Sequence, residues 1–404
     1  MRLAAVSPFI DRRHGTERSV AELLERLARD YRCEIHLFSQ RVEDLAVTRW
    51  TSHHQGAEGV IFWHPVPSLT GLPLLFTYIA WFFLNRFSRW TSTAFRRLRF
   101  DLVLSPGINC SDADVIVVHA LFHRLQQLSR EQRPVPGTPA AGRFRLAHRR
   151  LYYSLLASLE RRIYSKPRVA LGAVSPRTAA QLAEYFHRND VQVAPYGVDT
   201  SLFFPADRAA RRPQARAQRQ LSSNELLLLL IGNDWGNKGL GTILQALALL
   251  PNLPLRLLIV GRDAPEHFQT LARTLGVFDR CLWEQPSTEV REFYAAADIY
   301  VSPSREDSFG LPVAEAMACG LPAITSAGAG VGGLVEDGVD GFVLSDPLDA
   351  DVLAKLLRLL ADQPQLRERI GEAAANTARK WTWDNHAARV WQLLCAALER
   401  KSGK

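Results

Sequence analysis

Short apolar runs alternate with amphipathic stretches along most of this chain. The runs are rich in Leu, Val and Ile, as expected for strands buried on both faces of a parallel sheet. The runs expected as strands lie at 3–6, 33–39, 115–118, 170–175, 191–194, 226–231, 255–260, 299–303, 322–326 and 341–344. Between them, apolar residues recur at helical spacing, and the stretches expected as helices include 151–164, 177–187, 240–250, 288–297, 311–319, 350–361, 366–381 and 383–400. This alternation predicts a doubly wound α/β fold.

The alternation starts twice along the chain, which predicts two α/β domains. The first pattern fills residues 1–200 and the second fills residues 221–380. Between them lies the stretch 206–220, which is dense in Arg with Ala and Pro and is expected to be a linker. With 404 residues, of which 47% are hydrophobic and 22% charged, the chain is long enough to bury a core in each domain.

Cysteine usage and the first residues favour a reducing compartment. The five Cys are widely scattered and lack the CxxC or His spacing of a zinc site. The opening MRLAAVSPFIDRR has too short an apolar run for a signal peptide. We therefore expect a cytoplasmic protein without a bound metal ion.

The formal net charge of +8 suggests an anionic partner. Nucleic acid is not expected, because no zinc finger, RNA-binding aromatic strand motif or helix-turn-helix pattern accompanies the charge. The Arg residues cluster at 86–99, 143–150, 161–168 and 208–219. A cytoplasmic membrane surface carries anionic lipid and attracts such clusters, so we favour peripheral association with the inner face of the cytoplasmic membrane. The alternative is a scattered, solvated basic surface.

One stretch bears directly on membrane association. Residues 72–84 are almost unbroken apolar sequence, and Arg and aromatic residues are mixed from there to residue 99. The apolar segment is too short to span a bilayer, so no transmembrane helix is predicted. The mixture suits an interfacial helix that lies on a membrane. A buried core helix followed by a basic solvated helix fits the sequence equally well.

Residues 301–326 carry the most chemical information. They predict a strand end, an acidic loop, a helix and a second strand. Asp307 and Glu315 can each accept hydrogen bonds from two neighbouring sugar hydroxyls. The N–H groups at the helix start would hold a diphosphate. These N–H groups belong to Phe309, Gly310 and Leu311. Together these features describe a nucleotide-sugar site, although Asp307 as a plain helix cap and Glu315 as a solvated residue fit the composition as well.

The run SREDSFGLPVAEAMACGLPAI resembles the donor-site signature of retaining glycosyltransferases of the GT-B fold, in the large family 4 group. This resemblance implies two Rossmann-like, doubly wound domains that face one another across a cleft. It implies a helix at 381–404 that returns to the first domain. It also implies sugar transfer with retention of configuration, with a nucleotide-diphosphate sugar as donor and no metal or other cofactor.

The resemblance assigns roles within the acidic stretch. Glu315, at the second acidic position of the signature, would contact the ribose. Asp307, at the first position, would contact the donor sugar. The family has Glu at that first position, so the neighbouring Glu306 could share the role. Ser308 lies in the same loop and joins the predicted donor-binding residues, together with Phe309 and the start of the helix.

The loop GNDWGNKG, at residues 232–239, supplies the predicted cation. Lys238 stands beside glycines at a helix start and would neutralise the diphosphate leaving group. Asn233 occupies the position where the family has an Arg, and Arg262 is the candidate replacement for that charge. The loop does not fit a Walker motif, which argues against a kinase or ATPase.

The first domain offers weaker candidates. A polar turn containing Gly15 and Thr16 follows the first strand, and the resemblance implies that this turn faces the acceptor and the donor phosphate. His119 stands at the end of the strand 115–118, and His123 lies just beyond it. Related enzymes have a His after this strand that approaches the donor sugar, so His119 is the first candidate and His123 the second.

Three glycines near residue 330 have the spacing of a dinucleotide fingerprint. They are Gly328, Gly330 and Gly333. The fingerprint must open a helix, whereas residues 336–341 are broken by Gly and Asp, so NAD binding is not expected. We expect instead a flexible loop whose N–H groups reach the donor phosphates.

The sequence thus predicts a retaining glycosyltransferase that acts on a lipid-linked or cell-envelope glycan of the lipopolysaccharide type. Two alternatives stay open. One is another sugar-nucleotide enzyme of the same fold, such as an epimerase or a phosphorylase. The other is a non-catalytic, membrane-associated protein that binds a nucleotide sugar.

Overall fold

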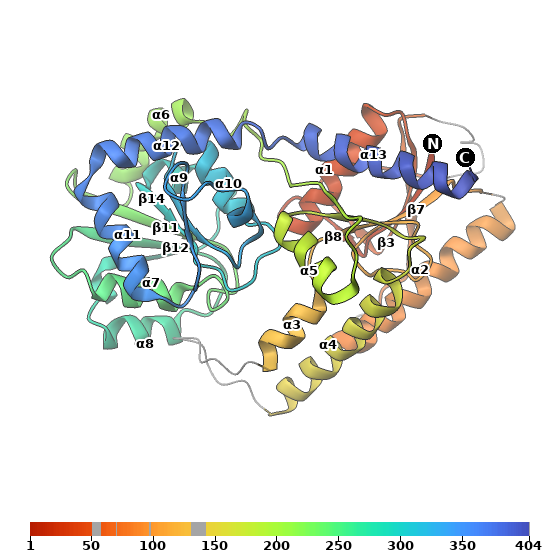
Figure 1. Cartoon of the computed structure of the whole chain (residues 1–404), viewed down its shortest axis with the longest axis horizontal. Coiled ribbons are helices and arrows are strands. Elements are labelled where there is room, and N and C mark those ends of the chain that lie inside the picture. Colours follow the sequence, from red (N-terminus) through yellow and green to blue (C-terminus); the bar gives the residue numbers. More distant parts are fainter. Residues whose placement is uncertain (51–57, 70, 97, 131–142, 404) are drawn as a thin grey trace. The chain divides into compact units, whose positions relative to one another are not determined.

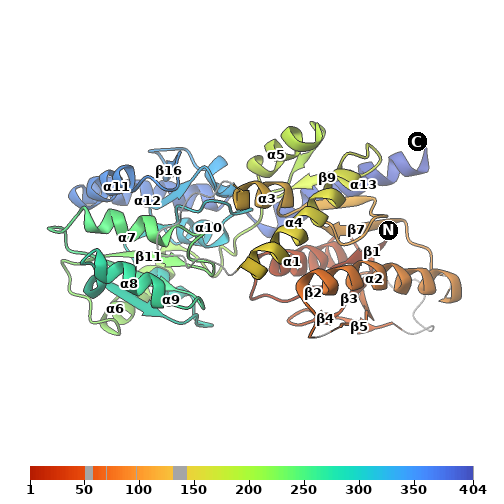
Figure 2. The ribbon, with the colours of Figure 1, turned by 90° about the horizontal axis from the view of Figure 1, so that it is seen from below.

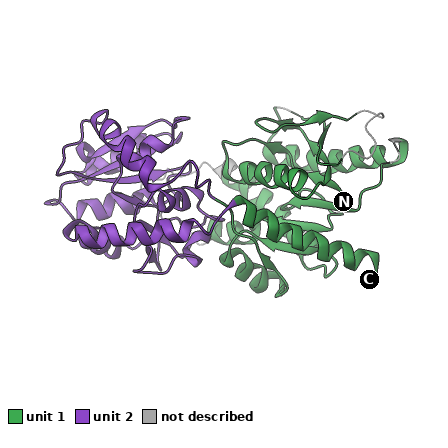
Figure 3. Cartoon of the chain, turned by 90° about the horizontal axis from the view of Figure 1, so that it is seen from above, with its two compact units in different colours: residues 1–132, 141–197, 383–404 green, residues 133–140, 198–382 purple. Residues whose placement is uncertain are grey.

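The computed structural model describes residues 1–50, 58–69, 71–96, 98–130 and 143–403, which divide into two compact units. Unit 1 comprises residues 1–132, 141–197 and 383–404, and unit 2 contains residues 198–382 (Figures 1 and 3). Each unit is built around its own parallel sheet with packed helices. The predicted α/β class is therefore confirmed for both halves of the chain.

Unit 1 contains a sheet with the strand order β10-β9-β8-β7-β1-β3-β6-β5, in which all pairs are parallel. Its strands are β1 (Arg2–Val6), β3 (Glu34–Ser39), β5 (Thr48–Arg49), β6 (Ile61–Pro65), β7 (Leu102–Pro106), β8 (Val115–Val118), β9 (Ala170–Ala173) and β10 (Gln192–Val193). A side pair joins β2 (Phe9–Ile10) and β4 (Arg41–Val42). Its helices are α1 (Gly15–Arg29), α2 (Leu74–Arg96), α3 (Phe122–Arg130), α4 (Arg143–Tyr164), α5 (Pro176–Phe186) and α13 (Trp383–Ser402).

Unit 2 contains a parallel sheet with the strand order β13-β12-β11-β14-β15-β16. Its strands are β11 (Leu226–Ile231), β12 (Leu255–Val260), β13 (Cys281–Glu284), β14 (Ile299–Val301), β15 (Ala323–Ser326) and β16 (Phe342–Leu344). Its helices are α6 (Pro205–Ala217), α7 (Leu240–Ala248), α8 (Glu266–Thr274), α9 (Arg291–Ala296), α10 (Leu311–Ala318), α11 (Ala350–Asp362) and α12 (Pro364–Ala378). Two 3-10 turns, η1 (Phe278–Arg280) and η2 (Gly330–Gly333), complete it.

The last helix, α13, packs on unit 1 rather than on unit 2. It lies along α1 (Figure 1). Arg26 Nε donates to Asp384 Oδ1 at 2.6 Å, and the rings of Tyr31 and Trp391 stack with centroids 4.8 Å apart. The buried His386 ring is hydrogen-bonded through Nδ1 to the carbonyl of Ala194 at 3.0 Å. This helix therefore closes the core of unit 1 from the far end of the sequence.

The predicted linker at 206–220 is wrong, because most of it is helix α6. The arginines of this stretch, which suggested a linker, form ion pairs within unit 2 instead. Arg212 Nη2 lies 2.5 Å from Asp298 Oδ1, and Arg216 Nη1 lies 3.0 Å from Asp298 Oδ2. The same carboxylate accepts the N–H of Leu227 at 2.8 Å. Asp298 thus anchors α6 against the start of β11.

Residues 129–150 are rich in Pro, Gly and Arg, a composition that predicts an exposed loop, and the structure contradicts this prediction for the last part of the stretch. Helix α4 already begins at Arg143, because LAHRRLYY continues the helical pattern that follows it. Residues 131–142 of the predicted loop lie outside the described residues. Helices α3 and α4 lie side by side (Figures 1 and 2).

Helix α2 is one continuous helix of 23 residues, and it combines features of both sequence alternatives. One face is buried and carries Trp81, Asn85 and Arg89. Arg89 forms a two-pronged ion pair with Asp112, with distances of 2.8 and 3.0 Å. The other face exposes aromatic rings. No helix in the described ranges is long and apolar enough to cross a bilayer.

Candidate functional site

The topology of unit 2 brings two loops of the sequence together. The strand order reverses at β11, which has β12 on one side and β14 on the other. Open α/β sheets bind ligands at the carboxyl ends of the strands beside such a switch point. The loops that leave β11 and β14 at this edge are 232–239 and 302–310, which contain most of the predicted donor-site residues.

The two loops are joined by Lys238 and its neighbour. Lys238 Nζ forms an ion pair with Asp307 Oδ2, in which the two side chains are only 16% and 17% exposed. Asn237 Nδ2 donates to the carbonyl of Glu306 at 2.7 Å, and Asn237 Oδ1 accepts the N–H of Glu306 at 3.2 Å. The Asn237 side chain thus both donates to and accepts from the backbone of Glu306. These two hydrogen bonds fix the position of the acidic loop 302–310 relative to the loop 232–239, which carries Lys238.

A glycine makes this contact possible. Gly239 has φ +83, and a Cβ added to it would lie 2.4 Å from the carbonyl oxygen of Pro303. Any other residue would clash with backbone there and would also strain its own backbone. Gly239 therefore lets α7 begin directly against the chain that leaves β14.

Glu315 lies inside unit 2 and is not a solvated helix residue. It is 6% exposed, and its Oε2 accepts a hydrogen bond of 2.7 Å from the hydroxyl of Tyr294 on α9. Burial raises the pKa of Tyr294 well above its usual range, and the neighbouring Glu315 charge adds to this shift, so the phenol stays a donor. The pKa of Tyr300, on β14, is also raised, first by burial and further by the charges of Asp307 and Glu315. Both predicted carboxylates therefore lie near Tyr300.

The start of α10 presents backbone donors beside these carboxylates. Gly310 caps the helix with φ 97, and Pro312 stands in its first turn. The N–H of Phe309 points to Asp307 Oδ1 at 3.3 Å, so it is not a purely free donor as predicted. For Gly310 and Leu311, no acceptor of their N–H groups is found among the described residues. These two donors give the helix start the positive character that suits an anion.

The predicted flexible loop near residue 330 is wrong, because this segment is packed and mostly buried. A Cβ on Gly328 would lie 2.3 Å from the carbonyl oxygen of Ser304, so the two backbones touch. Gly330 donates to the Asp307 carbonyl at 2.9 Å, and Val331 donates to the Phe309 carbonyl at 2.7 Å. These N–H groups support the acidic loop instead of reaching outward. No helix of the dinucleotide type starts here, only the turn η2.

Asn233 has a structural partner of its own. Its Oδ1 accepts the N–H of Arg262 at 3.0 Å, which ties the loop after β11 to the loop after β12. Asp263 accepts the N–H groups of Asp234 and Trp235 at 2.9 and 2.6 Å. The side chain of Arg262 is exposed at this edge, so it stays a candidate for the missing charge.

In unit 1, His119 is buried at the end of β8. Its Nδ1 is hydrogen-bonded to the hydroxyl of Tyr196, and its Nε2 is buried with no partner among the described residues. Burial lowers the pKa of His119 to about 3, and the nearby His386 contributes to this shift, so the ring is neutral at physiological pH. A neutral imidazole with one unused nitrogen is able to donate or accept one hydrogen bond from a ligand.

The other unit 1 candidates occupy two helix starts. Gly15 and Thr16 are exposed residues in the first turn of α1. His123 is held by Glu160 of α4, whose Oε2 lies 2.6 Å from His123 Nδ1. Glu160 also accepts the N–H groups of Phe122 and His123 at 2.7 and 2.8 Å, so it caps α3.

Two family models match the chain. The model described as glycosyl transferases group 1 matches residues 211–377, and the model described as Glycosyltransferase Family 4 matches residues 13–202. Together they take in both units. The chain belongs to family 4 of the glycosyltransferases. The resemblance found in the signature run is thus confirmed, and it extends through unit 1.

Solved structures show the fold of this family 4 protein. WaaG, a glycosyltransferase involved in lipopolysaccharide biosynthesis, superposes with a TM-score of 0.74 at 20% identity, with 100% of both chains covered. Anabaena HepE, solved with UDP-glucose, superposes with a TM-score of 0.67 at 17% identity, covering 98% of this chain and 100% of that one. The predicted GT-B fold is confirmed by these likenesses.

Curated relatives are about one third identical to this chain over the part that they match. A D-inositol 3-phosphate glycosyltransferase of Thermomonospora curvata is 35% identical over 245 residues, which are 56% of this chain and 57% of the relative. One of Xylanimonas cellulosilytica is 34% identical over 226 residues, which are 53% of each. The chain therefore spans little more than half the length of the curated relatives it matches.

Sequence reasoning missed the residues that hold the site of this family 4 protein in place. Asn237, Tyr294, Tyr196 and Glu160 each fix a predicted site residue from another part of the chain. Only Asn237 had a local signal, because it precedes Lys238 in the same polar loop. The other three are ordinary helix or loop residues in the sequence, and their roles depend on contacts between distant segments.

Proposed function

We propose that this chain is a retaining glycosyltransferase whose unit 2 holds a nucleotide-diphosphate sugar, without a bound metal ion. The observation that carries the proposal is the convergence at the β11/β14 switch point. Four features lie together there. They are the ammonium of Lys238, its partner carboxylate Asp307, the buried carboxylate Glu315, and the start of α10 with two available N–H groups. The family membership and the likeness to HepE, which was solved with UDP-glucose, support a donor of this class.

The chemistry of the donor follows from these groups. When the bond from the sugar to the diphosphate breaks, negative charge accumulates on the diphosphate, and stabilising that charge is the largest electrostatic task of the reaction. Lys238 carries three N–H donors, so it can keep Asp307 and still bind a phosphate oxygen. The N–H groups of Gly310 and Leu311 add backbone donors. Asp307 would then hold the donor sugar and Glu315, oriented by Tyr294, would hold the ribose.

A thermal-shift panel tests the donor site. The full chain is melted with UDP-, GDP- and ADP-sugars, next to Glu315→Gln and the matched control Glu368→Gln, which removes an exposed carboxylate on α12. A ligand at 100 times its Kd stabilises the native state by about 2.7 kcal/mol. We expect one nucleotide class to raise the melting temperature of the wild type and the control but not of Glu315→Gln.

Other outcomes of this panel identify other functions. No shift with any nucleotide sugar contradicts the donor site. A shift without turnover on any acceptor indicates a non-catalytic nucleotide-sugar-binding protein. Release of an isomerised sugar nucleotide, or turnover that depends on inorganic phosphate, indicates an epimerase or a phosphorylase.

The acceptor in this proposal is a lipid-linked or cell-envelope glycan, bound by unit 1 at a membrane surface. Helix α2 supports this. Its aromatic face comprises Phe76, Phe83, Phe87 and Trp90, which are 54%, 66%, 60% and 57% exposed. Their spacing of seven, four and three residues places them on one side of the helix. The helix contains three Arg and no Asp or Glu, so an anionic lipid surface suits it better than a cationic or neutral one.

Vesicle sedimentation tests membrane docking. The triple variant Phe83→Ser, Phe87→Ser, Trp90→Ser is compared with Leu202→Ser, Leu249→Ser, Val339→Ser, which removes exposed apolar side chains elsewhere. We expect wild type and control to sediment with phosphatidylglycerol vesicles, and the aromatic variant to bind at least tenfold more weakly. Equal binding by all three proteins would remove α2 from the proposal. A concentration-dependent dimer that the aromatic variant abolishes would assign the face to a second copy instead.

A further inference from the structure

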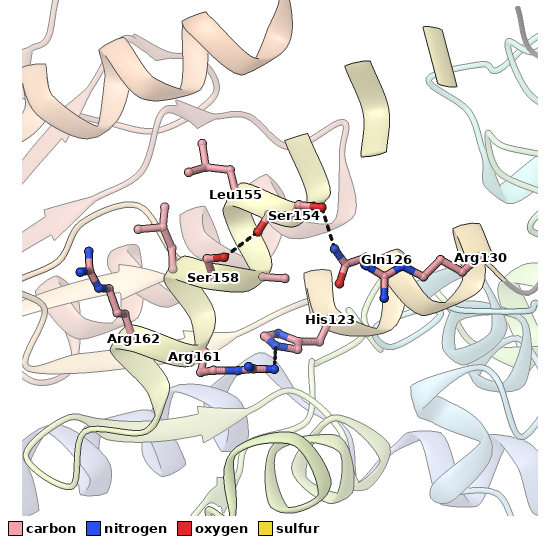
Figure 4. A pocket seen from close by; sticks show the side chains of 10 residues that line it. His123, Gln126, Arg130, Ser154, Leu155, Ser158, Arg161 and Arg162 are labelled. Atoms are coloured by element: carbon pink, nitrogen blue, oxygen red, sulfur yellow. Dashed lines mark hydrogen bonds between the residues drawn. The ribbon is translucent and has the colours of Figure 1, made fainter. Parts of the chain in front are cut away.

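Unit 1 contains a groove between α3 and α4, which is lined by His123 but by none of the predicted donor-site residues of unit 2. Its volume is about 700 Å³, and a smaller hollow of about 280 Å³ continues it past Gln126, Arg130 and Ser154. Figure 4 shows Arg161 extending toward the His123 ring and Gln126 extending toward Ser154 across the groove. Ligand sites of small molecules have volumes in this range.

The groove is strongly basic. Four arginines line the two hollows, and no carboxylate among the described residues lines either of them. The four are Arg130, Arg150, Arg161 and Arg162. Among the described residues, none of these four has a carboxylate partner, whereas Arg89 and Arg188 on the same unit are paired with Asp112 and Asp190. The groove arginines are thus kept available, and guanidinium groups match phosphate oxygens with two parallel hydrogen bonds.

A buried carboxylate organises the groove from the protein interior. The Glu160 side chain is 0% exposed, and it accepts bonds from the first N–H groups of α3 and from His123 Nδ1. His123 Nδ1 thus faces the buried carboxylate, and Arg161 Nη2 lies 3.5 Å from His123 Nε2 on the other side of the ring. This contact directs one guanidinium into the groove.

Neutral polar groups alternate with the arginines. Gln126 Nε2 donates to Ser154 Oγ at 2.8 Å, so the Ser154 hydroxyl proton can be given to a ligand. Ser158 Oγ donates to the Ser154 carbonyl at 2.9 Å, and its lone pairs face outward from this exposed position. Hydroxyl and amide groups beside guanidinium groups suit a ligand that has both phosphate oxygens and hydroxyls.

We propose that the α3/α4 groove binds the phosphate ester of a hydroxylated acceptor, that is, a phosphorylated sugar or polyol. The phosphate lies at the end of the groove that carries Arg161 and Arg162, and the hydroxyls lie against Ser154 and Gln126. The assignment of this ligand as the acceptor rests on the proposed function. The phosphate chemistry itself rests only on the groove. The phosphate comes either from a soluble phosphorylated polyol or from a lipid-linked one, and the two sources share this chemistry.

The test uses the full chain and two kinds of probe. Soluble probes are inositol phosphate and glucose 1-phosphate, next to inositol and glucose. The lipid probe is vesicles that contain phosphatidic acid, next to phosphatidylcholine vesicles. Binding is measured by calorimetry or sedimentation, and the reactivity of individual arginines toward phenylglyoxal is measured by mass spectrometry. The variant Arg161→Gln, Arg162→Gln is compared with Arg149→Gln, Arg168→Gln, which removes two exposed charges of unit 1 outside the groove.

The expected result is that phosphorylated probes bind, protect Arg161 and Arg162 from phenylglyoxal, and bind at least tenfold more weakly to the groove variant than to the control. Protection by the soluble probes identifies a free phosphorylated acceptor, and protection by phosphatidic acid alone identifies a lipid-linked one. If neither probe protects these arginines, or if both variants lose equal affinity, the inference is overturned. Donor binding is measured on the same variants, so a failure of the nucleotide-sugar site shows separately from a failure of the groove.

Discussion

The ion pair of Lys238 and Asp307 allows the donor chemistry to be tested through both stability and rate. Lys238→Met keeps the apolar stem and removes the ammonium, which leaves Asp307 with its carboxylate unpaired. The side chains are 16% and 17% exposed, so the pair lies between a surface pair, worth at most about 1 kcal/mol, and a buried pair, whose disruption costs about 3 to 5 kcal/mol. We expect a loss of about 2 kcal/mol. For a domain of this size, that lowers the melting temperature of unit 2 by roughly 4 to 8 °C.

The rate effect is larger than the stability effect. If Lys238 stabilises the departing diphosphate, its removal costs about 3 kcal/mol of transition-state stabilisation, which is roughly 100- to 1,000-fold in kcat. The assay is release of the nucleoside diphosphate from the donor identified by thermal shift, with water as acceptor, so that no acceptor needs to be known. Lys355→Met, which removes an exposed ammonium from α11, is the matched control.

A double-mutant cycle with Asp307→Asn decides whether the pair acts as one unit. Contacting residues show coupling of about 0.5 to 3 kcal/mol, whereas independent sites add within about 0.5 kcal/mol. We expect coupling of about 1 kcal/mol or more in stability. Unchanged release of the nucleoside diphosphate by Lys238→Met, or additivity of the two substitutions, would refute the reasoning.

Three further predictions concern buried groups. Asp298→Ala leaves Arg212, Arg216 and the N–H of Leu227 without their shared acceptor, so urea unfolding should show a loss of about 3 kcal/mol; a loss below about 1 kcal/mol would contradict this anchoring role. Tyr294→Phe removes the 2.7 Å hydrogen bond to Glu315 and should weaken donor binding several-fold in calorimetry. Unchanged donor binding would indicate that Glu315 does not contact the donor. The pKa of His119 is about 3 when folded and 6.5 when unfolded, so its contribution to stability is complete above pH 6.5 and is lost as pH falls toward 3. Between pH 7 and pH 5 this amounts to about 2 kcal/mol, and the pH dependence of urea unfolding should be flatter in His119→Leu.

The sequence predicted correctly those elements whose residue types fit only one kind of secondary structure. Strands β11 and β12 have the predicted bounds, because LLLLLI and LRLLIV are long apolar runs that fit only buried parallel strands. Strands β6 and β7 were not expected, since IFWHP and LVLSP are short and end in Pro. Helix α6 was taken for a linker because Pro213 and its arginines are typical of linkers. Only the position of Asp298 on the folded sheet shows what those arginines bind.

The candidate donor site was predictable in its parts and not in its assembly. Asp307 and Glu315 stand in one continuous signature run, so their identity could be obtained from local sequence. The contact of Lys238 with Asp307 joins positions 69 residues apart, and it exists because β14 pairs with β11. Strand order is set by packing of the whole sheet, so no local pattern contains this contact. The same holds for His119 and Tyr196, which are 77 residues apart.

Helix α2 shows why periodicity alone does not distinguish a helix that lies on a membrane from a helix buried in a protein core. Apolar residues at helical spacing give the same pattern whether they face a core or a lipid surface. The structure separates the two faces of α2: Asn85 is 0% exposed and Arg89 is 5% exposed, while Phe83 and Phe87 are 66% and 60% exposed. The Asn85 amide and the Arg89 guanidinium point inward and are hydrogen-bonded there, whereas the phenyl rings point outward. This arrangement is the reverse of that in an ordinary surface helix. Exposed apolar patches of this kind mark interaction surfaces, so the outward rings agree with the membrane docking proposed for α2.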